Sequence, residues 1–134
     1  MMYRKVNWTG GLAALAVVMA LPAAVLAAGV VLQGNLVGPV LGAGHGMVAY
    51  QANHRGTDAK LRINLEGVMV THSVDVVIQG QYVATMSLDA YGNGSLHLST
   101  RRGDDVPTLN NYDVVDIYDA GSTRVLLKGF VTPP

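Results

Sequence analysis

The sequence contains no cysteine among its 134 residues, so disulfide bonds and a lipid attached through cysteine are both excluded. Small secreted domains of disulfide-rich lineages depend on such bonds. Charged residues are also scarce, at 13% of the chain, and nine Lys and Arg balance nine Asp and Glu. This balance lacks the basic footprint of nucleic-acid-binding proteins, so no nucleic-acid partner is expected.

Large aromatic residues and catalytic motifs are few as well. The chain has one Phe, Phe130, and one Trp, Trp8. No serine lies in a Gly-x-Ser-x-Gly motif, which would mark a hydrolase nucleophile. His72 and Ser73 are adjacent, so their side chains would point to opposite faces of a strand. The sequence therefore predicts a protein that is not an enzyme and holds no cofactor.

An apolar run over 11–28 follows Arg4 and Lys5 and contains Pro22. A charged start, an apolar middle and a small-residue end are typical of a secretory signal peptide. We expect residues 1–27 to be removed after Ala27, leaving no membrane span. The alternative is an uncleaved anchor, because about 18 apolar residues can just cross a bilayer. Export without cysteines favours a periplasmic or secreted bacterial protein.

Removal of residues 1–27 leaves seven Lys and Arg against nine Asp and Glu, because Arg4 and Lys5 are lost. The remaining chain is long enough for one ordinary core. Its first part, 28–46, is rich in glycine, which raises the entropy cost of ordering it. We expect this segment to be a lead-in, with one edge strand near 30–32 or 35–37, or a flexible arm. The domain itself is expected over 47–134.

Apolar and polar residues alternate strictly over 59–66, and this period of two predicts a half-buried strand. A second such strand has Leu96 and Leu98 inward and His97 outward. The expected strands are 47–52, 59–66, 73–78, 82–88, 94–100, 114–118 and 124–131. Short turns rich in Gly, Asn and Asp separate most of them. We expect an all-β fold, a small antiparallel β-sandwich or partly open barrel of about seven to eight strands, with 101–112 crossing between two sheets.

Histidines and clustered aspartates are the candidate metal ligands. Imidazoles can hold copper or zinc, and the histidines are His45, His54, His72 and His97. Carboxylates in loops can hold calcium, and the nearest cluster is Asp104, Asp105 and Asp113. The histidine spacing matches no compact ligand motif, and Asp commonly initiates turns. A periplasmic or extracellular metal-binding domain is therefore the alternative function.

The favoured function is a binding or structural module of the bacterial envelope or medium, whose partner is an unknown protein or envelope component. Loops on a rigid sheet are where such modules place function. The loops 53–58 and 101–112 combine Arg, Asp and an aromatic residue. The candidate residues are Arg55, Arg101, Arg102, Asp104 and Tyr112. The alternative is that these loops only connect strands.

Two segments carry apolar residues on both faces of a strand. They are the central hairpin, with Val74, Val76, Val77, Ile78 and Val83, and the C-terminal segment, with Leu126, Leu127 and Phe130. Such strands are covered on both faces or expose a patch. The C-terminal segment is therefore either a homo-oligomer contact or an internal corner between two sheets.

Overall fold

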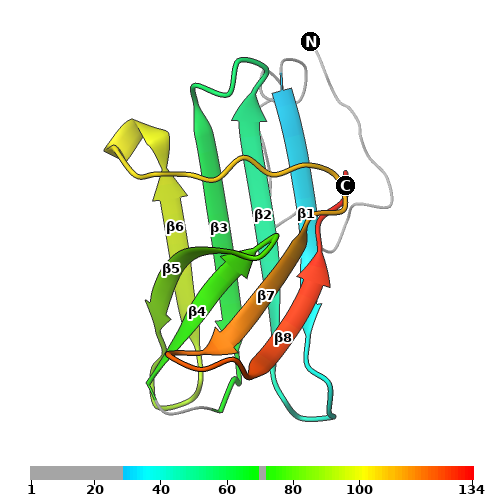
Figure 1. Ribbon diagram of the computed structural model, residues 1–134, viewed down its shortest axis with the longest axis vertical. Coiled ribbons are helices and arrows are strands. Elements are labelled where there is room, and N and C mark those ends of the chain that lie inside the picture. The colour runs from blue at the N-terminus through cyan, green and yellow to red at the C-terminus, as the bar shows by residue number, and fades with distance from the viewer. Residues whose placement is uncertain (1–28, 70–71) are drawn as a thin grey trace.

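The computed structural model describes residues 29–69 and 72–134 (Figure 1). Within these ranges the chain is all-β, with eight strands and one short 3₁₀ helix, η1 (Thr100–Arg102). The strands are β1 (Gly29–Val37), β2 (His45–Asn53), β3 (Ala59–Glu66), β4 (Ser73–Ile78), β5 (Gln81–Ser87), β6 (Gly94–Ser99), β7 (Val114–Asp119) and β8 (Val125–Phe130). The predicted signal peptide, 1–27, lies outside the described residues. No helix within those ranges is long and apolar enough to cross a membrane.

The strands form one antiparallel sheet in the order β5-β4-β7-β8-β1-β2-β3-β6. This sheet folds over on itself, so that β1, β2, β3 and β6 form one layer and β4, β5, β7 and β8 cross it as a second (Figure 1). The two layers meet where β8 pairs with β1. At the other side β5 and β6 end the order, which leaves the barrel nearly but not fully closed. The predicted antiparallel sandwich or partly open barrel is confirmed.

Local sequence signals explain the individual elements. In β3, every second residue is a buried apolar one and the charged residues between them are exposed, as the alternation predicts. The β4–β5 hairpin turns at Gln79 and Gly80, whose φ angles are 51° and 77°. Two consecutive positive φ angles match the twist of a tight two-residue hairpin. The glycine at this turn therefore fixes the pairing of β4 with β5.

The expectation of a lead-in segment over 28–46, with at most an edge strand, differs from the structure. β1 pairs with β2 along its whole length, and it also meets β8 at Val37 and Lys128. The glycine content misleads because Gly34 serves close packing. A Cβ atom on Gly34 would lie 2.2 Å from the carbonyl oxygen of Phe130 in β8. β1 is therefore an interior strand of the sheet, and its small residue lets the neighbouring backbone approach.

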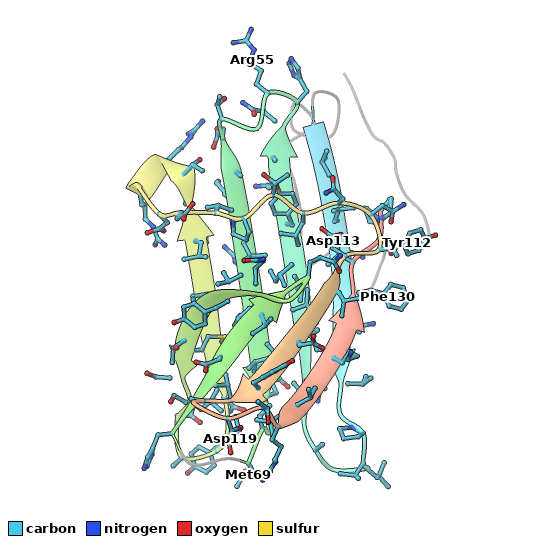
Figure 2. All side chains as sticks on the ribbon, viewed as in Figure 1. Arg55, Met69, Tyr112, Asp113, Asp119 and Phe130 are labelled. Atoms are coloured by element: carbon cyan, nitrogen blue, oxygen red, sulfur yellow. The ribbon has the colours of Figure 1, made fainter. Side chains whose placement is uncertain are left out.

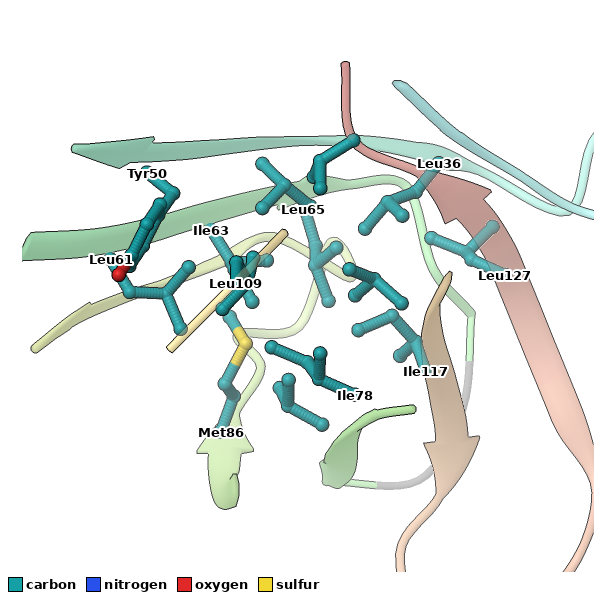
Figure 3. Close-up of a cluster of buried hydrophobic side chains, with 14 of the residues drawn as sticks. Leu36, Tyr50, Leu61, Ile63, Leu65, Ile78, Met86, Leu109, Ile117 and Leu127 are labelled. Atoms are coloured by element: carbon teal, nitrogen blue, oxygen red, sulfur yellow. The ribbon is translucent and has the colours of Figure 1, made fainter. Parts of the chain in front are cut away.

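The core lies between the two layers and consists of aliphatic side chains with few aromatic ones (Figure 3). The connection from η1 to β7 crosses from one layer to the other, as predicted for 101–112 (Figure 1). Leu109 in this connection is only 2% exposed and lies in the core. Burial raises the pKa of Tyr50, whose side chain is hydrogen-bonded to the backbone of Leu109. The connection therefore closes one end of the sandwich.

The C-terminal strand β8 lies at the corner between the layers. Leu126 and Leu127 are buried, whereas Phe130 is 56% exposed. β8 pairs with β7 on one side and with β1 on the other. Of the two interpretations of this apolar segment, the internal corner accounts for Leu126 and Leu127.

Candidate functional site

The histidines named as metal candidates are dispersed. His45 begins β2 and lies 3.2 Å from Glu66, whereas His54 lies just beyond the other end of that strand. His72 precedes β4, and His97 lies on the outer face of β6. Among residues 29–69 and 72–134, no three His, Asp or Glu side chains gather in a way that could hold a metal ion.

The three candidate aspartates also have separate roles. Asp104 accepts a hydrogen bond from the backbone N–H of Ser99, and Asp113 accepts one from the backbone N–H of Asn110. Asp105 is exposed and lies on the connection between them. Asp104 and Asp113 therefore cap different turns at the two ends of that connection.

The structure brings the start of the 101–112 connection next to the 53–58 loop, but it places Tyr112, at the end of that connection, elsewhere. Arg101 in η1 lies 2.9 Å from Asp58, at the end of the 53–58 loop. Arg55 projects from the tip of that loop, and Tyr112 lies far from it beside Phe130 (Figure 2). Arg101 and the 53–58 loop thus form one continuous surface next to the end of β6.

Tyr112 belongs to a second surface on the opposite side of the molecule (Figure 2). Its φ is 70°, in the left-handed region that bulky residues rarely adopt. Its ring centroid lies 6.1 Å from that of Phe130, and both rings are exposed. Phe130, Val37 and Met47 line a groove of about 570 Å³ along the junction of β1 and β8. This aromatic surface is separate from the predicted arginine loops.

The core is incompletely covered along the side where the sheet ends. Five hydrophobic side chains pack against the core while remaining partly exposed. Two belong to β6, one to β5, one follows β5 directly and one follows η1; they are Leu96, Leu98, Val83, Leu88 and Val106. All five therefore lie on or next to the two end strands, where one more strand would cover them.

The free edge of β6 already forms hydrogen bonds with residues outside the sheet, as both donor and acceptor. The backbone N–H of Ser99 donates to Asp104 Oδ2 at 2.9 Å, and the backbone N–H of Asp104 donates to the Ser99 carbonyl at 3.1 Å. Asp104 thus occupies both outward backbone groups of Ser99, one through its side chain and one through its backbone N–H. Hydrogen-bonding direction alternates along a strand, so Ser95 and His97 direct their backbone groups to this same edge.

Arg102 completes this arrangement at the end of β6. Its Nη2 lies 2.8 Å from Asp104 Oδ2 and also donates to the backbone carbonyl of His97. The hydrogen bonds from Arg102 and Ser99 lower the pKa of Asp104. Partial desolvation, followed by the positive charges of Arg62 and Arg102, lowers the pKa of His97. At neutral pH, therefore, the Asp104 carboxylate is ionised and the His97 imidazole is neutral.

The edge of β5 is built differently. Its register with β4 shifts between Val76 and Val77, which leaves Val83 unpaired as a β-bulge. Bulges interrupt regular pairing and protect edge strands from adding further strands. β6 has a continuous register with β3. Neither end strand contains Pro, Lys, Arg, Asp or Glu, so the two edges differ in the bulge and not in charge.

Sequence reasoning identified several of these residues but not what they form. His97 was a metal candidate, and Arg102 and Asp104 were loop-binding candidates. Leu96 and Leu98 were assigned to the interior, and their partial exposure follows from the sheet order, which the sequence does not reveal. No local signal in 94–99 marks it as an end strand, because uncharged segments also form the interior strand β2. No protein-family model matches the sequence, and no curated protein is significantly similar to it.

Proposed function

We propose that this protein is an exported, non-enzymatic binding module that adds an extended segment of a partner protein to the free edge of β6. The observation that carries the proposal is the coincidence of two features at one place. β6 keeps a regular register with β3 and has no other strand paired at its outer edge, and its own Leu96 and Leu98 pack against the core while partly exposed. Strand addition gives affinity through backbone hydrogen bonds and specificity through alternate side chains.

The orientation of the β6 side chains determines which residues the partner segment would need. Leu96 and Leu98 face inward, so every second residue of the partner segment would cover them with an apolar side chain. The residues between would point outward beside His97. The backbone N–H of His97 and both backbone groups of Ser95 would pair with the segment. The hydrogen bonds between Asp104 and Ser99 support the proposal in that outward backbone groups of β6 already bond outside the sheet.

Export remains part of the proposal and is supported by the charged start, apolar middle and small-residue end of residues 1–27. All eight described strands lie beyond the predicted cleavage site at Ala27. Removal of residues 1–27 would therefore leave all eight described strands intact. Such a protein would meet its partner in the periplasm or outside the cell.

The test is selection of binding peptides from a displayed random library, followed by N-methylation of alternate backbone nitrogens of a selected peptide. N-methylation removes backbone donors without changing side chains, so it should abolish binding in one register and spare it in the other. Leu96→Glu should also abolish binding, while the matched change Val37→Glu on the far side should not. Recovery of no peptide, or binding that survives both N-methylation patterns, would overturn the proposal.

A further inference from the structure

The edge of β6 lies beside an unbalanced positive surface. Lys60 and Arg62 of β3 are paired in register with Ser99 and His97 of β6, so they point outward next to that edge. Both side chains are exposed, and neither takes part in an ion pair within the described ranges. Arg102, at the end of β6, is by contrast paired with Asp104.

Three carboxylates beside this surface are already paired with other residues. Glu66 lies 3.2 Å from His45, at the end of β3 that pairs with the start of β6. Asp58 lies 2.9 Å from Arg101, and Asp104 lies 2.8 Å from Arg102. None of the three is paired with Lys60 or Arg62. Desolvation, followed by the positive charges of Arg62, Arg102 and Lys60, lowers the pKa of His97.

We infer that the segment added to β6 carries carboxylates at its outward positions. This inference rests on the proposed strand addition and names the chemistry of the partner. An added strand would place its outward side chains about 5 Å from those of β6 and about 10 Å from those of β3. The distance to β3 is slightly more than the Debye length of about 8 Å at physiological salt and well within that of about 30 Å at about 0.01 M. Arg62 and Lys60 would therefore attract carboxylates there, most strongly at low salt.

A second copy of the chain is a poorer occupant of this edge. The outward residues that β6 of another copy would bring to this edge are Ser95 and His97, which carry no carboxylate. Arg62 and Lys60 would lie about 14 Å from their copies, because both β6 strands would separate them. A segment with carboxylates at its outward positions is the better complement to these cations.

The test compares three peptides with the same inward apolar residues and with Glu, Gln or Lys at the outward positions. We expect the Glu peptide to bind about tenfold more tightly than the Gln peptide at low salt, corresponding to two screened charge pairs. The Lys peptide should bind most weakly, and high salt should remove the differences. Arg62→Glu should reverse the preference, whereas Arg55→Glu, at the tip of the 53–58 loop, should leave it unchanged.

The outcomes separate this inference from the proposed function. Equal affinity of the Glu and Gln peptides, with binding still abolished by N-methylation, would overturn the acidic partner and leave strand addition standing. Binding of the Glu peptide that survives N-methylation at either set of alternate nitrogens would overturn strand addition itself. A dimer in sedimentation experiments that Leu96→Glu dissociates would show that a second copy occupies the edge, and would overturn the inference.

Discussion

The two layers of this sandwich meet at two sides, and only one of them is closed by strand pairing. Where β8 meets β1, the backbones are in close contact, and Leu36 and Leu127 behind them are fully buried. β5 and β6, at the opposite ends of the sheet order, do not pair with each other. Leu96 and Leu98 remain partly exposed there.

The difference shows how residue size decides closure. Gly34 and Gly129 leave room for the β1 and β8 backbones to cross, since a Cβ on Gly129 would lie 2.0 Å from the Asn35 carbonyl oxygen. On the open side, the bulge at Val83 and the Arg102–Asp104 pair occupy the two edges instead. The closed side therefore brings the two backbones into contact, whereas the open side leaves part of the core exposed, and the proposed partner would bind there.

The largest expected effect is at the closed side. Gly129→Ala should destabilise the fold by about 3 kcal/mol or more, because the new methyl group forces β1 and β8 apart. Gly121→Ala is the matched control, since its φ is 75° but its surroundings are open. It should cost only about 1 kcal/mol. Urea unfolding of both variants measures the difference, and an equal loss would contradict the account of the closed side.

A matched pair of leucines compares the two sides directly. Leu127→Ala, at a fully buried position, should lower the free energy of unfolding by about 3 kcal/mol. Leu98→Ala, at the open side, should lower it by only about 1 kcal/mol, because its side chain is already partly hydrated. Leu98→Ala should nevertheless weaken a selected peptide, whereas Leu127→Ala should not. Similar stability losses in both variants would show that the open side is as well packed as the closed one.

The smallest effect concerns pH. Desolvation, followed by the cations Arg62, Arg102 and Lys60, lowers the pKa of His97 from 6.5, with Asp104 acting in the opposite direction. The unfolded chain therefore binds a proton more readily, and the free protein loses stability as pH falls below that value. Carboxylates bound beside His97 would raise its pKa again.

Binding of the Glu peptide should consequently strengthen by a few-fold as pH falls from about 7.5 to about 5.5, where glutamate remains ionised. His97→Asn should remove this dependence while retaining a neutral polar side chain. Titration calorimetry at several pH values measures both proteins. A pH-independent affinity of the unmodified protein would show that no carboxylate lies beside His97.

Much of the fold was predictable because its signals are local. The alternation in 59–66 and the glycine at position 80 determine a strand and a hairpin from neighbouring residues alone. The pairing of β3 with β6 joins segments some thirty residues apart, and no local pattern specifies it. The open side depends on that pairing. From the sequence alone, Leu96 and Leu98 were therefore predicted to be ordinary core residues. Gly34 misled for a related reason, since its role is a contact with distant β8.

The most direct test of the open side is amide hydrogen exchange by NMR on the protein with and without a selected peptide. In the free protein, the Leu96 and Leu98 amides, which pair with β3, should be protected, and those of Ser95 and His97 should exchange quickly. Bound peptide should protect Ser95 and His97 while leaving β1 and β8 unchanged. A bound peptide that leaves the Ser95 and His97 amides exchanging as before would contradict strand addition at β6.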